Sequence, residues 1–399
     1  LAAVLLVMAG AHVVVARYDL IAMGALDDPC VFVSNDPSET AACDVTPSPS
    51  PGGSLEPTDE PIGSPEMTAT PPPIQGSALP NATIPPWNGT ERLNILLIGS
   101  DERPGEGTYN TDTLIVVSIE PTTGQVAMFS LPRDSWGVPL PAGRLQNAFG
   151  PTYEAKINSL FTAIRGRPDL VAGNSRTRGY NGLKAVLGEL YGLDIKYFVE
   201  VNFDGFKQVV DAMGGVTINV QVPVTDDRYP SDTGRLSRVY IPAGIQHMTG
   251  SQALVYARSR HDSDDFDRGF RQQRVLTSLR EQADVENLIP RIPELLKAVR
   301  ATVKTDIPQA ELAKLAGLSA TIDTKNIRSY VFSYPRYGTQ VLAPIYKYLP
   351  DVGLIRAAVA SAFTVDPALE ATRTALAVEK ASIWVLNGTN QSGQASALA

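Results

Sequence analysis

The chain has 399 residues, which is enough for two or three domains of ordinary size. Its formal net charge is −8, but residues 18–91 hold 11 acidic residues and no Lys or Arg, so the rest of the chain has a net charge of +3. This slight positive charge suits an anionic partner, but it is too small for a protein that binds nucleic acid. Only three His are present and both Cys precede residue 44, which excludes zinc clusters, a Cys nucleophile later in the chain and most catalytic triads.

The first 16 residues are apolar except for His12, although a membrane-spanning helix needs about 20 such residues. Because the chain begins with Leu, we interpret residues 1–16 as the remaining part of a truncated transmembrane anchor. The alternative is the apolar region of a cleaved signal peptide, since small residues near Ala16 and Ala25 permit cleavage. Either interpretation exports the rest of the chain, and the acidic stretch that follows agrees, because positive charge is retained inside. We therefore expect a single-pass protein of the cell membrane whose folded part is extracytoplasmic.

A short exported segment and a Pro-rich linker are predicted to come next. Residues 17–45 contain Cys30 and Cys43, and an exported pair of this kind more often forms a local disulfide than a metal site. Residues 46–91 contain 12 of the 31 Pro of the chain, a composition that cannot bury enough apolar surface to fold. This second segment is therefore predicted to be a disordered linker.

The folded body is expected to start at residue 92. Apolar runs and turn residues predict strands at 94–98, 113–119, 125–131, 197–201 and 216–222, the second and third of them paired as a hairpin. Helical spacing predicts helices at 203–213, 251–257, 268–282, 292–303 and 309–318. Strands and helices mixed in this order predict a layered α/β/α domain with a central mixed β-sheet.

The hairpin predicts that charged residues meet at one end of this sheet. Asp112 stands just before its first strand and Arg133 just after its second, so antiparallel pairing places both at the same end. Asp101 and Arg103 follow the strand at 94–98 and reach that end if this strand runs parallel to the second hairpin strand. Carboxylates grouped near basic residues can hold Mg²⁺ beside phosphate oxygens. The alternative is a set of ordinary polar residues at strand ends.

A second charged segment, residues 258–274, holds five Arg and four Asp. On the helix that starts at Arg268, the side chains of Arg268 and Gln272 extend from the buried stripe at its amino-terminal end. Arg258 and Arg260 fall on one side if their segment is extended. Arg binds phosphate oxygens through two parallel hydrogen bonds, and several Arg at one site would repel each other without an anion. The segment therefore predicts a pyrophosphate site, and its alternative is a solvated run of charges.

Two weaker signals leave their alternatives open. Lys156, in KINSL, can add a phosphate contact or can be an ordinary surface lysine. Apolar and aromatic residues such as Phe198 and Phe203 can line a groove for a lipid, although such residues more often form the core.

Several blocks of residues in fixed order resemble the LytR-CpsA-Psr family. They span about residues 92–331 and read NILLIGSDER, TDTLIVVSI, SLPRDS, KINSL, VEVNFDGFKQVVDAMGGV and LVYARSRHDSDDFDRGFRQQR. The resemblance implies an Mg²⁺-dependent phosphotransferase of cell wall assembly, which moves a glycopolymer (teichoic acid, capsule or arabinogalactan) from a polyprenyl-pyrophosphate carrier to peptidoglycan. The catalytic domain would occupy residues 92–350, followed by a linker or helix at 351–380 and the start of a truncated C-terminal domain at 381–399.

The resemblance also implies a role for each charged residue. Asp101 and Asp112 would hold Mg²⁺, Asp265 would act as the base for the acceptor hydroxyl, and Arg133 would be the second catalytic residue. The pyrophosphate would contact Arg103, Arg133, Arg258, Arg260, Arg268 and Gln272. One departure from the family pattern is Asn110, where an Arg is usual, and it puts one phosphate contact in doubt.

Two other functions are compatible with the same residues. A phosphatase or pyrophosphatase would act on the same lipid with water in place of the acceptor. A non-catalytic lipid-binding or regulatory protein, such as a transcriptional attenuator, is the alternative outside enzymes. Export and the absence of any nucleic-acid-binding motif argue against contact with DNA.

Overall fold

The structure is a computed structural model of the chain, and it describes residues 89–102, 109–175, 177–230, 236–259, 265–282, 303–308 and 327–364, with the single positions 311, 315, 318 and 322. At positions 101, 102, 265 and 266 it describes the backbone and not the side chain. The chain divides into two units, residues 1–359 and 360–399, and nearly all described residues belong to the first.

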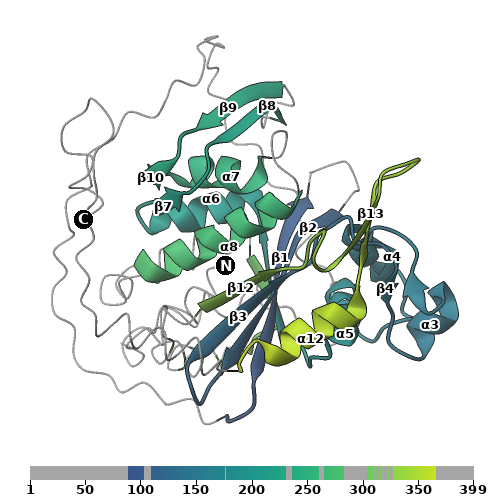
Figure 1. Ribbon diagram of the computed structural model, residues 1–399. Helices are drawn as coiled ribbons and strands as arrows, with labels where there is room; N and C mark the ends of the chain where they lie inside the picture. Colours follow the sequence, from purple (N-terminus) through teal and green to yellow (C-terminus); the bar gives the residue numbers. More distant parts are fainter. Residues whose placement is uncertain are drawn as a thin grey trace, which may run out of the picture. The chain divides into compact units, whose positions relative to one another are not determined.

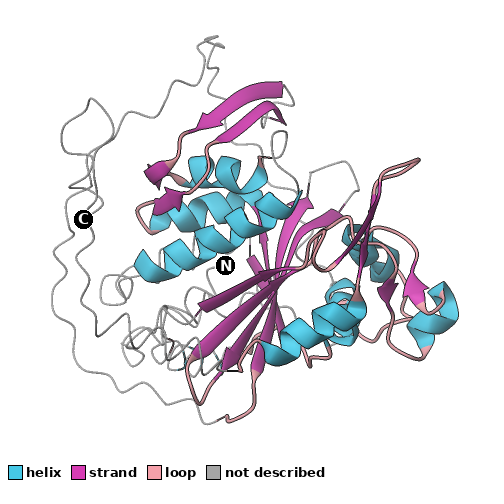
Figure 2. Ribbon diagram, viewed as in Figure 1, coloured by secondary structure: helices cyan, strands magenta, loops and turns pink. Residues whose placement is uncertain are grey.

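A six-stranded mixed sheet forms the centre of the first unit (Figures 1 and 2). The neighbours β6 and β1 are parallel, as are β3 and β12, and the other three pairs are antiparallel. In spatial order the strands are β11 (Val303–Thr305), β6 (Tyr197–Asn202), β1 (Leu93–Glu102), β2 (Tyr109–Glu120), β3 (Gln125–Ser130) and β12 (Ile327–Val331).

The hairpin predicted from the sequence is confirmed. Strands β2 and β3 pair in register from Ile115 opposite Ser130 to Glu120 opposite Gln125. Because β1 and β3 both run antiparallel to β2, they run in the same direction. The carboxyl ends of β1, β3, β6 and β12 therefore meet the amino end of β2 at one edge of the sheet, called the site end below.

Both faces of the sheet are covered, which completes the predicted α/β/α layering. Ile95 and Leu97 of β1 join a core with the helices α6 (Phe203–Ala212), α7 (Gly250–Arg258) and α8 (Asp265–Gln282). Leu96 and Ile98, which are just as buried, belong to the opposite face because side chains alternate along a strand. That face is covered by α4 (Leu160–Arg165), α5 (Arg178–Tyr191) and α12 (Val352–Ser361) (Figure 2).

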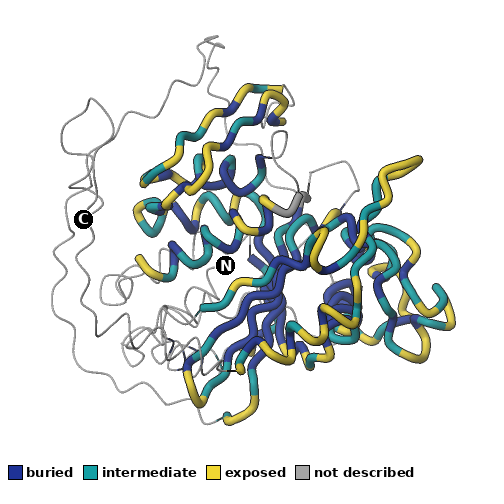
Figure 3. Tube along the Cα trace, viewed as in Figure 1, coloured by how far each residue is buried: buried dark blue, intermediate teal, exposed yellow. Residues whose placement is uncertain are grey.

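Smaller two-stranded sheets extend from this body. Figure 3 shows the central strands buried along most of their length, whereas the hairpins at the margin are exposed. The smaller elements are β4 (Val138–Pro139) with β5 (Thr152–Tyr153), α3 (Arg144–Phe149), the short η1 helix (Ile157–Ser159), β7 (Val216–Val220) with β10 (Gly244–Met248), β8 (Val224–Pro230) with β9 (Leu236–Ile241), and β13 (Gly338–Val341) with β14 (Lys347–Pro350).

Several predicted elements differ from the observed ones. Arg258 is the last residue of α7, so its segment is not extended at that point, and Val303 lies in β11 although a helix was predicted to include it. The strand β12, the hairpins β8–β9 and β13–β14, and the helix α5 were not predicted. The sequence of β12, IRSYV, is short and mixed, and it forms a strand through its parallel pairing with β3.

Predictions for the two ends of the chain lie outside the described residues, apart from α12. These are the anchor, the Cys30–Cys43 disulfide, the linker and the C-terminal domain. Within the part of the chain that the structure describes, no helix is both long and apolar enough to cross a bilayer.

Candidate functional site

A β-bulge at the site end presents Asp112. Gly99 of β1 pairs with Thr113 and Ser100 pairs with Thr111, so Asp112 is the extra residue on β2. Gly99 permits this close pairing, because a Cβ atom there would lie 2.8 Å from the Cβ of Thr113. Bulges bend a strand and redirect a side chain, and they are frequent next to active sites. The bulge therefore releases Asp112 from the regular alternation of β2.

Arg133 reaches this carboxylate from the turn that follows β3. Its Nη1 donates a hydrogen bond of 2.8 Å to Oδ2 of Asp112, and its Nε lies 3.7 Å from Oδ2 of Asp134. Oδ1 of Asp112 is buried and has no hydrogen-bond partner among the described residues. A buried carboxylate oxygen without a donor is costly, so it is a good position for a cation or a donor from a ligand.

The KINSL segment holds the turn that carries Arg133. The amide of Ile157 donates to the carbonyl of Ser135 at 2.9 Å, and the amide of Asn158 donates to the carbonyl of Arg133 at 3.3 Å. The ammonium group of Lys156 pairs with the carboxylate of Asp134. Lys156 therefore lies beside Asp134, the residue that follows Arg133, and it adds positive charge to the same turn.

Helix α8 is anchored at the carboxyl ends of β3 and β12. Nε2 of Gln273 donates to Oγ of Ser130 at 2.6 Å and to the carbonyl of Tyr330 at 3.0 Å. One turn earlier, Gly269 packs so closely on Val331 that a Cβ atom would lie 2.9 Å from its Cγ1. The helix therefore runs toward the site end as it approaches its first turn, which carries Arg268 and Asp265. The side chain of Arg268 is buried.

Helix α7 brings Arg258 to the same end. Arg271 of α8 donates from Nε to the carbonyl of Tyr256 at 2.9 Å and from Nη2 to the carbonyl of Ser259, which joins the end of α7 to α8. The guanidinium of Arg258 lies 3.9 Å from the ring centroid of Phe203. Phe203 follows Asn202, which pairs with Ser100 of β1, so Arg258 lies near the end of β1 that contains Asp101. Burial lowers the pKa of the Arg271 guanidinium from its usual value.

The structure thus brings part of the predicted site together. Asp112, Arg133, Arg258 and Arg268 lie at one end of the sheet, and the backbone of Asp101 is there as well. Gln272 is half-buried on α8. The side chains of Asp101 and Asp265, and all of Arg103 and Arg260, lie outside the described residues.

Sequence reasoning missed a buried acid beside the site. Glu200 of β6 is buried, and its Oε1 accepts a hydrogen bond of 2.5 Å from Oγ of Ser100. Its Oε2 accepts from the hydroxyl of Tyr180, which lies 3.1 Å from the hydroxyl of Tyr109, and Nζ of Lys304 is 4.0 Å away. Burial, and then the charge of Glu200, raise the pKa of Tyr109 well above its ordinary value. The available signal was one acid inside the apolar strand YFVEVN.

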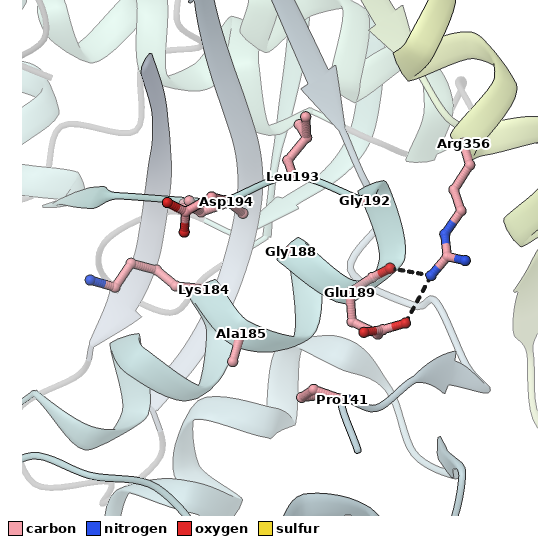
Figure 4. A pocket seen from close by; sticks show the side chains of 10 residues that line it. Pro141, Lys184, Ala185, Gly188, Glu189, Gly192, Leu193, Asp194 and Arg356 are labelled. Carbon is pink, nitrogen blue, oxygen red and sulfur yellow. Dashed lines mark hydrogen bonds and ion pairs between the residues drawn. The ribbon is translucent and has the colours of Figure 1, made fainter. Parts of the chain in front are cut away.

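A separate cavity of about 650 Å³ opens on α5 (Figure 4). Its lining includes residues 193–195, which lead into the amino end of β6, so it lies at the opposite end of the sheet from Arg133. Arg356 beside this cavity donates to Oε1 of Glu189 at 2.9 Å and to the carbonyl of Leu190 at 3.2 Å. These contacts attach α12 to the end of α5, and we assign the cavity no part in the site.

The sequence resembles those of transferases of cell wall assembly. The polyisoprenyl-teichoic acid–peptidoglycan teichoic acid transferase TagU of Bacillus mycoides is 27% identical over 225 residues, which are 56% of this chain and 63% of the relative. The TagU of Oceanobacillus iheyensis is 30% identical over 246 residues, 60% of this chain and 68% of the relative. The chain thus spans less than two thirds of the Bacillus mycoides relative.

Solved structures share the fold. The crystal structure of Bacillus subtilis TagV superposes with a TM-score of 0.51 at 24% identity and covers 70% of this chain and 100% of that one. A protein from Streptococcus agalactiae gives a TM-score of 0.52 at 22% identity and covers 68% of this chain and 88% of that one. The sequence profile of the LytR_cpsA_psr family matches residues 71–352. Since this match covers well over half of the sequence, the chain belongs to the LytR_cpsA_psr family.

Proposed function

We propose that the chain is a phosphotransferase that moves a glycopolymer from a polyprenyl-pyrophosphate carrier to peptidoglycan in cell wall assembly. Family membership and the activity for which the TagU relatives are named support this proposal. The observation that carries it is the pair at the bulge, where Arg133 binds one oxygen of Asp112 and the other oxygen is buried without a partner among the described residues. A cation-binding carboxylate beside an anion-binding Arg suits a pyrophosphate substrate.

The proposed reaction is a displacement at phosphorus. A hydroxyl of peptidoglycan attacks the phosphorus next to the glycan and forms the new phosphodiester bond, while the bond to the bridging oxygen breaks. The electron pair of that bond leaves with the polyprenyl phosphate, and the proton of the hydroxyl passes to a base, for which Asp265 is our candidate. Arg133, Arg258 and Arg268 would bind the phosphate oxygens and stabilise the charge that develops on them, with Arg103, Arg260 and Gln272 as further contacts.

Asp112 fits a role in holding Mg²⁺, together with Asp101. Mg²⁺ prefers carboxylate oxygens, and Oδ1 of Asp112 is a buried oxygen with no donor among the described residues. When bound, Mg²⁺ would neutralise charge on the pyrophosphate oxygens. Within the described part of the chain no three His, Cys, Asp or Glu side chains form a metal-binding group, and the side chain of Asp101 is not among the described ones.

The same proposal places the site outside the cytoplasm, with residues 1–16 as the membrane anchor. This location follows from the sequence pattern and from the substrate, because a polyprenyl carrier resides in a membrane and peptidoglycan lies beyond it. The slight positive charge of the chain after residue 91 suits an anionic glycopolymer, and no contact with nucleic acid is proposed.

The test uses the full chain with a polyprenyl-pyrophosphate-linked glycan, peptidoglycan fragments and Mg²⁺. Glycan attachment and release of lipid phosphate are followed for the wild type and Arg133→Ala. We expect attachment that requires Mg²⁺ and falls by about 10³-fold in Arg133→Ala, the effect of losing one preorganised charged donor.

A matched control is Arg167→Ala, which removes an Arg from an exposed Arg–Asp pair of 2.7 Å that follows the carboxyl end of α4. This control is expected to retain activity. Release of phosphate without attachment would support a pyrophosphatase instead. Binding of the lipid without any turnover, equal in wild type and Arg133→Ala, would overturn the catalytic proposal.

A further inference from the structure

The tip of the β13–β14 hairpin is an exposed apolar run. Residues 341–345 read VLAPI, and all five are exposed (Figure 3). The exposed fractions reach 74% at Leu342 and 53% at Ile345. These five residues are called the apolar tip below. A consecutive apolar run of this length is uncommon on a soluble surface unless it binds something.

The hairpin residues behind the apolar tip are aromatic and cationic, and one exposed acid, Glu154, accepts a hydrogen bond from Trp136 beside them. Residues 334–350 contain Arg336 and Lys347 and no Asp or Glu. Nζ of Lys347 lies 3.9 Å from the ring centroid of Trp136, and Tyr334 is exposed. Aromatic rings and cations collect at the headgroup level of a bilayer, and cations favour anionic lipids. This order, with apolar residues outermost and cations behind them, matches the polarity of a lipid–water interface.

The hairpin is hydrogen-bonded to the turn that carries Arg133. The amide of Tyr348 donates to the carbonyl of Asp134 at 3.2 Å, and the amide of Trp136 donates to the carbonyl of Tyr348 at 2.8 Å. Ile345 is three residues from Tyr348, so the apolar tip begins about 10 Å beyond this junction at the rise of a strand. A surface that binds the tip would therefore lie close to the site end of the sheet.

The base of the hairpin is fixed to the body. The side chain of Tyr348 is fully buried, and its hydroxyl donates to the carbonyl of Tyr337 at 2.7 Å. Burial raises the pKa of this phenol above its ordinary value, and a tyrosine is a neutral donor at physiological pH in either case. In Figure 1 the β13 hairpin extends away from the sheet, and the tip is its outermost part. An exposed tip on a fixed base can set a distance between the site and whatever the tip binds.

The β8–β9 hairpin differs in charge and pattern. It also exposes apolar side chains, with Leu236 at 65% and Tyr240 at 57%. Its described residues carry both signs of charge, and Arg238 pairs with Asp227 at 2.8 Å. Its exposed apolar residues are separated by polar ones in the strand LSRVYI. This hairpin therefore shows what an ordinary exposed hairpin of the same chain looks like, and it supplies matched controls.

We propose that the apolar tip inserts into the interfacial region of a bilayer that contains anionic lipids. Inserted there, the hairpin holds the turn of Arg133 near the headgroup level, where the pyrophosphate of a membrane-borne carrier lies. The docking is independent of the transfer reaction, and only the benefit for substrate delivery rests on the proposed function.

The test places a reporter on the tip of the full chain. Leu342→Trp and the control Leu236→Trp are compared with the parent chain on vesicles of phosphatidylglycerol and phosphatidylcholine whose acyl chains are brominated. Residues 1–16 are themselves apolar, so sedimentation with vesicles alone is not diagnostic, whereas bromine quenches only a Trp that reaches the acyl region. We expect the emission added by Leu342→Trp to fall by about half or more, with a blue shift, and that of Leu236→Trp to stay unchanged.

Two outcomes would overturn the proposal. The first is an unquenched Leu342→Trp emission in chains that sediment with the vesicles. The second is self-association of the chain without vesicles that Leu342→Asp abolishes and Leu236→Asp leaves intact, because a second copy would then cover the tip. Neither experiment contains glycan or peptidoglycan, so its failure is distinguishable from failure of the transferase proposal.

Discussion

Two arginines near the site end show how differently one residue type is used in this chain. Arg271 is buried at the junction of α7 and α8, and it donates to the backbone carbonyls of Tyr256 and Ser259. Arg133 stands in a turn with a side chain 19% exposed, and it pairs with carboxylates. Arg271 therefore joins two helices, whereas Arg133 has the exposure and the carboxylate partner that suit a ligand site.

The difference lies in the acceptors. Backbone carbonyls held by a helix end are fixed and neutral, so Arg271 cannot be released without leaving them unsatisfied. A carboxylate at a bulge can exchange one cation for another, and Oδ1 of Asp112 has no donor among the described residues. Burial and type of acceptor thus separate an arginine that supports the fold from one that can bind an anion.

The largest effect on transfer is expected when Asp112, the carboxylate partner of Arg133, is removed. Asp112→Ala should reduce the rate of glycan attachment by about 10³-fold, or about 4 kcal/mol, because it removes the proposed Mg²⁺ ligand and the partner of Arg133. Its unfolding free energy in urea should change by less than about 1 kcal/mol, since the pair is partly exposed. Initial rates at several Mg²⁺ concentrations provide the measurement.

Asp169→Ala is the control for this change, since it breaks the exposed pair with Arg167, which has no partner in the proposed machinery. A milder change, Asp112→Asn, should raise the Mg²⁺ concentration that gives half the maximal rate. If Asp112→Ala instead lowers stability strongly and leaves the transfer rate intact, the bulge is a structural feature and Arg133 resembles Arg271.

At the junction of α7 and α8 the main effect is expected on stability. Arg271→Met should lower the unfolding free energy by about 3 kcal/mol, because two buried carbonyl groups lose their donors. The neighbouring Arg274→Met should cost less than about 1 kcal/mol, since Arg274 bonds to the exposed side chain of Gln221 and reaches the hydroxyl of Tyr256 only at 3.4 Å. Urea unfolding of both variants gives the difference directly, and equal stabilities would contradict the structural role of Arg271.

Glu200 is expected to affect both properties, the transfer rate as Asp112 does and the stability as Arg271 does. Glu200→Gln keeps the shape but replaces one acceptor oxygen by an NH₂ group, so either Ser100 or Tyr180 loses its acceptor. We expect a loss of about 1–2 kcal/mol in unfolding free energy. A fall in transfer rate of about 10-fold is also expected, because Ser100 directly precedes Asp101 and a small displacement there is costly.

An additional readout separates the two effects of Glu200→Gln. The charge of Glu200 contributes to the raised pKa of Tyr109, so the variant should let this phenol ionise at a lower pH in an alkaline titration. In the wild type a raised phenol pKa stabilises the fold below pH 10, and this contribution is lost as the pH rises further. An unchanged phenol titration would show that the two groups are not coupled.

The hairpin and the helix next to β6 were predictable because their patterns are local. Apolar alternation and a Gly-containing turn specify β2 and β3, and Phe203–Ala212 ends at two glycines. Strand β12 was not predictable because only its pairing with β3 makes it a strand. The position of Asp112 and Arg133 at one end followed from the hairpin alone, but the bulge did not, since the sequence carries no mark of a register shift.

The roles within the Arg-rich segment were beyond the sequence for a similar reason. Arg268 and Arg271 lie one helical turn apart, and both are buried in the structure. Only the packing of α8 on α7 shows that Arg271 donates its hydrogen bonds to the carbonyls of Tyr256 and Ser259. Glu200 was overlooked because an acid in a strand is usually taken for a surface residue, whereas β6 is covered on both faces.

The smallest effect is expected at Glu154, whose side chain is exposed and bonds to two half-buried residues. Glu154 accepts hydrogen bonds from Oγ1 of Thr152 at 2.6 Å and from Nε1 of Trp136 at 2.9 Å, and these bonds lower its pKa, in that order of importance. A carboxyl group with a lowered pKa stabilises the fold above its ordinary pKa, and the contribution is lost as the pH falls through the lowered value. Because Glu154 is almost fully exposed, solvent screens these bonds, and Glu154→Gln should change the unfolding free energy by less than about 0.5 kcal/mol at neutral pH. Unfolding in urea at neutral and acidic pH measures the difference, which should shrink further in acid. A difference as large as that of Arg271→Met would show that exposure does not separate the two kinds of polar contact in this chain.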